Sequence, residues 1–280
     1  MSTSEEFLRS AHPVEPQVRA QIMQALGEIE SRHQVSVLFA CESGSRGWGF
    51  ASPDSDYDVR FIYVHRLPWY LTVSPGRDVI ELPISGELDI NGWDLRKALG
   101  LMRESNPTLL EWLNSPIVYR EEAGTMAQFR ALSESAFSNL KGWNHYASMA
   151  RKNFREHLQA EEVRYKKYLY VLRPLLAARW IRERSSSPPM RFAKLAKHTL
   201  DAAADAVLIA EINALLEVKM RAGESATSPR WQGIHAFIEA ELLRNAAEPV
   251  PALPIAGQAA LDAFLHDTVL RMHSASEAKA

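Results

Sequence analysis

Residues 42–58 read Glu42-Ser-Gly-Ser-Arg-Gly-Trp-Gly-Phe-Ala-Ser-Pro-Asp-Ser-Asp-Tyr-Asp58. The stretch follows a short run of β-forming apolar residues, 35–41, which predicts a buried strand. Its glycines and its proline predict a loop without regular structure, and a second strand is expected over 56–64. Because residues two apart point to the same face of a strand, the side chains of Asp56 and Asp58 are expected to lie side by side.

Paired carboxylates next to a glycine-rich loop indicate phosphate chemistry. Two carboxylates a few ångströms apart repel each other unless a cation neutralises them, and hard oxygen ligands suit Mg²⁺ or Mn²⁺. Glycine lets backbone N–H groups approach a phosphate closely, and Ser45 and Arg46 supply further donors beside Gly44. The alternatives are a plain flexible turn for the glycines and a solvated turn after Pro53 for the aspartates. The combination favours nucleotidyl transfer.

A third carboxylate would complete a site for two metal ions, and a later expected strand offers two candidates. Asp89 is flanked by apolar residues on both sides, as in a strand interior. Asp94 lies where that strand gives way to a helix, which is a natural position for a helix N-cap. On a regular strand, side chains five residues apart face opposite sides. We assign Asp89 to the metal and Asp94 to the cap, and the reverse assignment stays open.

The chain divides into a mixed first part and a helical second part. Apolar spacing predicts helices over 14–33, 95–104 and 106–112, a loop over 65–78, and further strands over 79–84, 87–94 and 117–119. After about residue 124 every segment has helical spacing, over 125–139, 142–159, 161–184, 190–221, 229–247 and 256–273. We expect an α+β fold in which a short mixed β-sheet flanked by helices forms a catalytic domain over 1–124. An all-helical domain over 125–273 and a frayed tail over 274–280 follow.

Composition excludes several classes of protein. The 280 residues carry 32 Lys+Arg and 34 Asp+Glu, so there is no global basic surface for nucleic acid, although a local patch remains possible. The single cysteine, Cys41, excludes a disulfide within the chain and a cysteine zinc cluster, and is expected to be a buried strand residue. The acidic first residues and the lack of an apolar run of ~18 residues argue against a signal peptide or a membrane span, so we expect a cytoplasmic location. No P-loop motif is present.

The helical part has a cluster of cations of its own. Lys166, Lys167 and Arg173 lie close together and are interleaved with tyrosines. On a helix, Lys166, Tyr170 and Arg173 fall near one face, which could close over a triphosphate or an RNA end. An ordinary solvated helix surface is the alternative, since charge is common there. Three tryptophans near the motifs are expected to pack against other residues rather than to stack on bases, namely Trp48, Trp93 and Trp112.

Gly44-Ser45, ten further residues, Asp56-x-Asp58 and a later apolar–Asp–apolar strand together resemble the DNA polymerase β-like nucleotidyltransferase superfamily. Further stretches resemble its predicted-nucleotidyltransferase branch associated with RNA repair: Gly44-Ser-Arg-Gly-Trp-Gly, Ser52-Pro-Asp-Ser-Asp-Tyr-Asp-Val-Arg, Trp93-Asp-Leu-Arg-Lys, Ser105-Asn-Pro and Lys166-Lys-Tyr-Leu-Tyr. The core resemblance covers about residues 35–95, and the resemblance to the branch runs to about 195.

The resemblance implies a role for each matched residue. Gly44 and Ser45 would hold the β- and γ-phosphates of a nucleoside triphosphate (NTP), ATP or another. Asp56 and Asp58 would bind two Mg²⁺ or Mn²⁺ ions, and Asp89 would bind the ion that activates the attacking hydroxyl. The implied reaction transfers a nucleoside monophosphate, with release of pyrophosphate, to an acceptor such as an RNA 3′ end. The alternatives are a protein or small-molecule acceptor, or a non-catalytic nucleotide- or partner-binding module.

Overall fold

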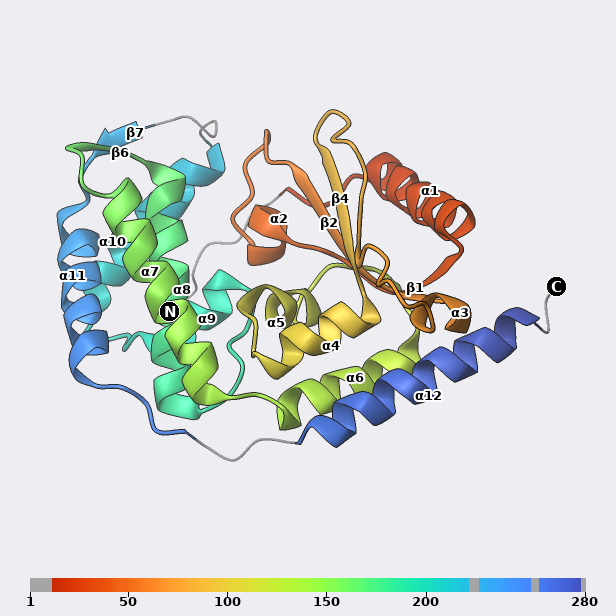
Figure 1. Cartoon of the computed structure of the whole chain (residues 1–280). Coiled ribbons are helices and arrows are strands. Elements are labelled where there is room, and N and C mark those ends of the chain that lie inside the picture. The colour runs from red at the N-terminus through yellow and green to blue at the C-terminus, as the bar shows by residue number, and fades with distance from the viewer. Residues whose placement is uncertain (1–11, 222–226, 253–256, 278–280) are drawn as a thin grey trace. The chain divides into compact units, whose positions relative to one another are not determined.

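The structure is a computed structural model that describes residues 12–221, 227–252 and 257–277. Its helices and strands are labelled in Figure 1. The chain folds into two compact units. The sheet unit contains the described residues of 14–44, 56–137 and 257–277. The helical unit contains the described residues of 12–13, 45–55 and 138–252.

A five-stranded mixed sheet forms the centre of the sheet unit. Its strands are β1 (Val35–Glu42), β2 (Tyr57–His65), β3 (Val79–Glu81), β4 (Leu88–Asp94) and β5 (Val118–Glu121). The order across the sheet is β3-β4-β2-β1-β5. Strands β2 and β4 run parallel, and the other neighbours pair antiparallel. The expected α+β fold with a short mixed sheet is therefore confirmed.

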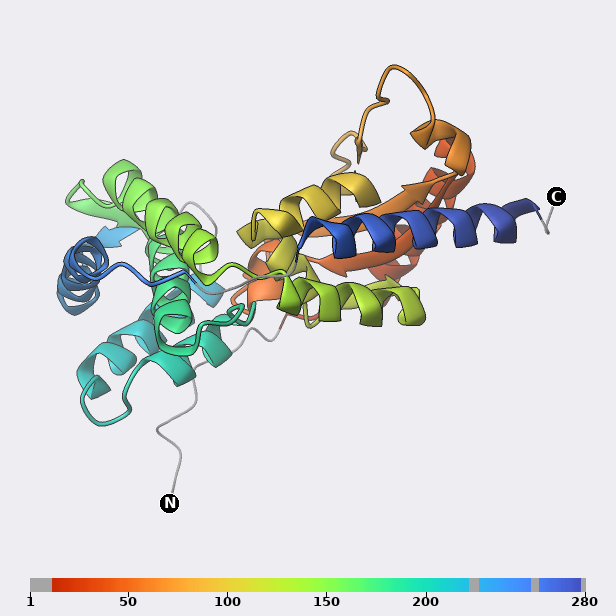
Figure 2. The same ribbon diagram turned by 60° about the horizontal axis from the view of Figure 1, so that its bottom comes forward.

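Helices cover both faces of this sheet (Figures 1 and 2). On one face, α1 (Pro16–His33) buries an apolar stripe against the strands through Ile22, Leu26 and Ile29. The other face is covered by α4 (Leu95–Arg103), α5 (Pro107–Leu113), α6 (Ala123–Ser135) and α12 (Gln258–Glu277). Figure 2 shows α12 running alongside α6, where the rings of Phe129 and Phe264 lie 5.4 Å apart. A single-turn helix, α3 (Leu67–Tyr70), follows β2.

The helical unit is built around one buried helix. Its elements are α7 (Asn139–His157), β6 (Glu162–Arg164), α8 (Tyr165–Arg184), α9 (Phe192–Thr199), α10 (Ala206–Arg221), β7 (Thr227–Pro229) and α11 (Gln232–Ala247). Helix α8 packs against α7, α9, α10 and α11, and its residues from Val171 to Ala178 are all buried. Strands β6 and β7 pair antiparallel. Among the described residues, no helix is both long and apolar enough to span a membrane.

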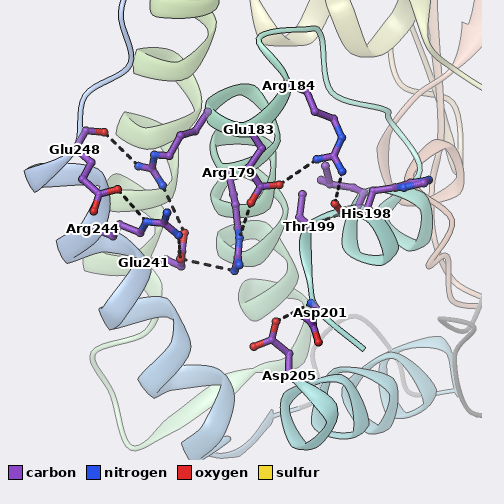
Figure 3. Close-up of polar contacts among 12 residues, drawn as sticks. Arg179, Glu183, Arg184, His198, Thr199, Asp201, Asp205, Glu241, Arg244 and Glu248 are labelled. Carbon is purple, nitrogen blue, oxygen red and sulfur yellow. Dashed lines mark hydrogen bonds and ion pairs between the residues drawn. The ribbon is translucent and has the colours of Figure 1, made fainter. Parts of the chain in front are cut away.

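Ion pairs reinforce the packing of α8 against α11 (Figure 3). The buried carboxylate of Glu241 lies 3.7 Å from Arg179, 4.0 Å from Arg182 and 3.6 Å from Arg244. Arg244 also pairs with Glu248 at 3.0 Å. Because a buried charge without partners is costly, the three arginines explain how Glu241 is tolerated in this interface.

The unit boundaries differ from the predicted domain boundaries. Helix α6 buries Met126 and Phe129 in the core of the sheet unit, and α12 adds Leu261 and Val269 to the same core. Both helices were expected in the helical domain, because their spacing shows an apolar face but not its partner. In the opposite direction, residues 45–55 belong to the helical unit. The expected division at residue 124 is therefore not the one the structure shows.

Several predicted elements also need correction. The loop expected over 42–55 contains a single-turn helix, α2 (Gly44–Trp48). The helix expected over 190–221 is broken between α9 and α10, where Asp201 Oδ1 accepts hydrogen bonds from the N–H groups of Ala203 and Ala204. The second half is not purely helical, since β6 and β7 form a small sheet. Of the expected frayed tail, residues 274–277 lie in α12 and residues 278–280 lie outside the described residues.

Candidate active site

Asp58 and Asp89, which we call the carboxylate pair, lie opposite each other on neighbouring strands. They are partners in the parallel register of β2 and β4. Val59 and Phe61 of β2 pack in the core on the α1 side. Side chains alternate along a strand, so Asp58 faces the other side of the sheet. Both carboxylates are partly exposed, with 27% of the Asp58 side chain and 36% of the Asp89 side chain accessible.

Asp56, which was expected to lie beside Asp58, precedes β2 and is exposed. No group of three or more His, Cys, Asp or Glu side chains in the described ranges is arranged to hold a metal ion. The metal roles of Asp56, Asp58 and Asp89 therefore stay predictions. The carboxylate pair alone supplies hard oxygen donors of the type that Mg²⁺ prefers, and Mg²⁺ is often held by only one or two carboxylates together with substrate phosphates. The donor set fits such an ion.

Gly44 lies directly against Asp58. Its φ of +55° falls in the left-handed region that favours glycine. A Cβ at this position would lie 1.8 Å from Asp58 Oδ2 and 2.7 Å from the carboxyl carbon. Gly44 is therefore required both for the backbone turn and for the space that the Asp58 carboxylate occupies. Its predicted contact with phosphate is a separate matter and stays a prediction.

Glu42 is a site residue that the sequence did not single out. The residue is fully buried at the end of β1. Its Oε1 accepts a hydrogen bond of 2.9 Å from the backbone N–H of Asp58, and its Oε2 accepts one from the Tyr119 hydroxyl. Burial is the larger cause of the raised pKa of Tyr119, and the negative charge of Glu42 is the second. The Tyr119 hydroxyl therefore keeps its proton and donates it to the hydrogen bond. The only signal in the sequence is a carboxylate that ends an otherwise apolar strand.

Asp94 has the structural role that was expected for it. Its Oδ1 accepts from the backbone N–H of Arg96 at 2.9 Å, which caps α4. Its Oδ2 accepts from the Tyr70 hydroxyl at 2.6 Å. Asp94 is completely buried, and this burial raises its pKa to about 6. The helix cap uses one oxygen of the Asp94 carboxylate, and the hydrogen bond from Tyr70 uses the other.

Ser45 and Arg46 belong to the helical unit, whereas Gly44 belongs to the sheet unit. Arg46 is buried, and its guanidinium donates to the carbonyl oxygen of Ser55 at 2.8 Å and to that of His12 at 3.2 Å. In the structure Arg46 thus closes the loop 45–55 on itself. Ser45 accepts backbone hydrogen bonds from Gly49 and Phe50 at 3.0 Å, which end α2.

The loop 45–55 is anchored within the helical unit through Trp48. The Arg173 guanidinium lies 4.2 Å from the centre of the Trp48 ring, and the Tyr170 ring meets Trp48 edge-on at 5.8 Å. Arg173 is buried, so it is not part of a solvated helix face. The prediction that Trp48 packs rather than stacks on a base agrees with these contacts. Trp93 and Trp112 likewise stack on each other at 3.7 Å in the sheet unit.

Lys166 and Lys167 lie in the first turn of α8. Lys167 Nζ lies 3.2 Å from His157 Nε2 and 5.2 Å from the centre of the Tyr170 ring. Burial lowers the pKa of Lys167, and the charges of Lys166 and Arg164 lower it further. Three cations therefore gather at the start of this helix, where the helix dipole also favours negative charge.

The chain matches the model of RlaP, the RNA repair pathway DNA polymerase beta family, over residues 18–267. It is 48% identical over 227 residues to YcgL, an uncharacterized protein of Bacillus subtilis (strain 168). The aligned residues cover 81% of this chain and 86% of YcgL. The structure of a nucleotidyltransferase-like protein from Exiguobacterium sibiricum 255-15 superposes with a TM-score of 0.30 and is 13% identical in sequence. The superposition covers 89% of this chain and 76% of that protein's chain. That score is too low to support an argument, whereas the family match covers most of the chain. The chain therefore belongs to the RNA repair pathway DNA polymerase beta family.

Proposed function

We propose that the protein is a metal-dependent nucleotidyltransferase that moves a nucleoside monophosphate from an NTP to an acceptor hydroxyl. The observation that carries the proposal is the carboxylate pair, which lies in register on β2 and β4 with Gly44 against Asp58. Membership of the family supports the same chemistry. The acceptor oxygen would form a bond to the α-phosphorus while the bond to the β-phosphate oxygen breaks, and pyrophosphate would leave.

In this proposal Asp56, Asp58 and Asp89 hold two Mg²⁺ or Mn²⁺ ions. Such ions, when bound, neutralise charge on the reacting phosphate and on the leaving pyrophosphate. Asp89 would take the proton of the attacking hydroxyl, because its carboxylate is the more exposed of the pair. Gly44 and Ser45 would hold the β- and γ-phosphates. Glu42 would orient Asp58 through the backbone and would not touch the substrate.

The cations of α8 are proposed to bind an anionic substrate. Lys166 and Lys167 lie beside Arg164, and the charges of Lys166 and Arg164 lower the pKa of Lys167, so positive charge is concentrated at the start of this helix. This charge would attract a triphosphate or the backbone of an RNA end. Arg173 would contribute indirectly, because its guanidinium packs on Trp48 and keeps the loop 45–55 in place. Arg46 would act in the same way through Ser55.

The acceptor we propose is the 3′ end of an RNA, such as a damaged tRNA, in the cytoplasm. The RNA repair description of the family supports this choice. The net charge of −2 does not favour wide coating of RNA, but one 3′ end needs only a local basic patch. The cations at the start of α8 would provide it.

A labelling assay tests the proposal. The purified protein is incubated with Mg²⁺ or Mn²⁺, with each α-³²P-labelled NTP in turn, and with total cellular RNA plus a protein extract. We expect label in an RNA band with the wild type and none with Asp56→Ala/Asp58→Ala. An Asp78→Ala variant is the matched control. Asp78 lies in the same unit as Asp56 and Asp58, but its carboxylate forms an ion pair with Lys97.

Each outcome of the assay has a distinct meaning. Label in a protein or small-molecule band would keep the transfer chemistry and overturn the RNA acceptor. Binding of NTP without transfer to any acceptor would overturn the enzymatic proposal and favour a non-catalytic nucleotide-binding module. Label that persists in the double aspartate variant would show that neither Asp56 nor Asp58 takes part in the chemistry.

A further inference from the structure

Arg60 links the two members of the carboxylate pair. It lies two residues after Asp58 on β2 and so shares its face of the sheet. The guanidinium Nη2 donates to Asp58 Oδ1 at 2.9 Å and to Asp89 Oδ2 at 2.7 Å. Nη1 donates to the carbonyl oxygens of Val59 and Asp89, both at 3.0 Å. One arginine therefore contacts four oxygens, and a single nitrogen is shared by both carboxylates.

Charge explains why this contact matters. Two carboxylates that face each other across neighbouring strands repel, and partial burial strengthens the repulsion. Only 17% of the Arg60 side chain is exposed, so its charge is screened less than in a surface ion pair. The two carbonyl contacts fix the plane of the guanidinium, which limits the entropy lost in pairing. Arg60 is thus suited to neutralise the pair when no other cation is present.

A divalent ion would use the same oxygens. Nη2 already engages Asp58 Oδ1 and Asp89 Oδ2, and the second oxygen of Asp58 lies against Gly44. An ion that binds both carboxylates must therefore either displace the guanidinium or lie close to its positive charge. Both possibilities weaken binding of the ion.

We propose that Arg60 is a built-in counter-cation, which holds Asp58 and Asp89 together in the metal-free protein and competes with the divalent ion. Arg60 is a positioning residue in this account, because it acts through the two carboxylates. The competition rests on the proposed function, since it assumes that the pair binds metal. The role in the metal-free protein does not depend on that assumption.

The first test measures the metal-free protein. Thermal unfolding in chelator is compared for wild type, Arg60→Met, Asp89→Asn and Arg60→Met/Asp89→Asn. Arg60→Met is expected to lower Tm, because two carboxylates are left facing each other. Adding Asp89→Asn to Arg60→Met is expected to raise Tm, because it removes one of the two charges. A further fall in Tm on adding Asp89→Asn would overturn the counter-cation role.

The second test measures binding of Mn²⁺ by calorimetry, without nucleotide. Arg60→Met is expected to lower the Kd by about tenfold, the order expected when a single positive charge close to a divalent ion is removed from a watery site. Arg60→Lys keeps the charge but not the four contacts, and its Kd should lie between the two. Arg77→Met is the matched control, since Arg77 pairs with Glu81 on the exposed surface of the same unit. An unchanged or higher Kd in Arg60→Met would overturn the competition.

The two proposals fail in different ways. If wild type binds Mn²⁺, Asp58→Asn abolishes that binding, and Arg60→Met does not tighten it, the metal site stands and the competition is wrong. If Asp58→Asn leaves Mn²⁺ binding unchanged, the metal role in the proposed function is wrong and the competition falls with it. The comparison in chelator still decides whether Arg60 neutralises the pair, and Arg60→Gln, which also removes the positive charge, is used there if Arg60→Met does not fold.

Discussion

The carboxylate of Asp58 lies against the backbone of Gly44, at a place where a Cβ would come within 1.8 Å of Asp58 Oδ2. The glycine of the Gly-Ser motif therefore has a role that does not depend on nucleotide. It leaves the space in which one catalytic candidate lies, and the positive φ at the same residue turns the chain out of β1. Gly44 of the Gly-Ser motif and Asp58 of β2 thus belong to one structural feature.

Gly44→Ala is expected to destabilise the protein more than Gly86→Ala. Both glycines have positive φ, +55° and +60°, so both changes carry the left-handed penalty of about 1–2 kcal/mol. Only the Cβ at 44 meets another residue, and displacing Asp58 should cost about 1–3 kcal/mol more. Urea unfolding measures both variants. Equal losses of unfolding free energy would show that Gly44 does not make room for Asp58.

Glu42→Leu is expected to lower the unfolding free energy by about 2–4 kcal/mol. The substitution leaves the Asp58 N–H and the Tyr119 hydroxyl buried without their acceptor. Glu42→Gln keeps an acceptor for Asp58 and should be milder. Tyr119→Phe is the control, because it leaves one buried group, Glu42 Oε2, without its partner instead of two, and should cost about 1–3 kcal/mol. The account is contradicted if Glu42→Leu is no worse than Tyr119→Phe.

Asp94 is expected to make stability depend on pH between about 4 and 7. Its folded pKa of about 6 lies above the ordinary value of 3.8, so the folded state binds the proton more tightly. The stabilisation is therefore full below pH 4 and is lost as the pH rises through 6, by up to about 3 kcal/mol. Asp94→Asn keeps the cap and removes the titration.

The measurement is urea unfolding of wild type and Asp94→Asn from pH 4 to pH 8. The stability of Asp94→Asn relative to wild type should increase as the pH rises, with most of the change between pH 4 and pH 6 and little above pH 7. A constant difference across this range would show that burial does not raise the pKa of Asp94.

Trp48→Ala is expected to free the loop 45–55 from the helical unit. The substitution removes the ring on which Arg173 and Tyr170 pack. Amide hydrogen exchange in peptides from 45–55 should speed up at least tenfold, which corresponds to about 1.4 kcal/mol and lies within the range of a partly buried cation–π contact. Trp180→Ala removes a similar stack, with Arg184 at 4.4 Å, away from this loop and is the matched control. Equal exchange in both variants would contradict the anchoring role.

The sheet could be predicted because its signals are local. The apolar run 35–41 and the alternation after Asp56 suffice for β1 and β2, and Asn106-Pro107 marks the start of α5 through its cap and first-turn proline. Asp94 was assigned as a cap on the same kind of local evidence, and its bond to Arg96 confirms this. The family resemblance, built on the spacing from Gly44 to Asp58, is likewise confirmed.

What could not be predicted depends on partners distant in sequence. The apolar faces of α6 and α12 do not reveal that both pack on the sheet. From the sequence, Arg60 is predicted only to lie in a strand. Its contact with Asp89 follows from the register of β2 with β4, which the sequence does not reveal. Trp48 and Arg173 are 125 positions apart (173 − 48), so the anchoring of the loop is invisible in either segment alone.

The most direct test of the central claim compares Asp89→Asn with Asp94→Asn in single-turnover transfer of labelled NMP to the acceptor identified by the labelling assay. Both substitutions replace one carboxylate with an amide on the same strand, but only Asp89 belongs to the carboxylate pair. We predict that Asp89→Asn lowers the rate at least 100-fold, the order seen when a group acting in proton transfer is removed. Asp94→Asn should stay within about threefold of wild type near pH 7, since Asn is as good an N-cap as Asp. Full activity in Asp89→Asn, or loss confined to Asp94→Asn, would contradict the account.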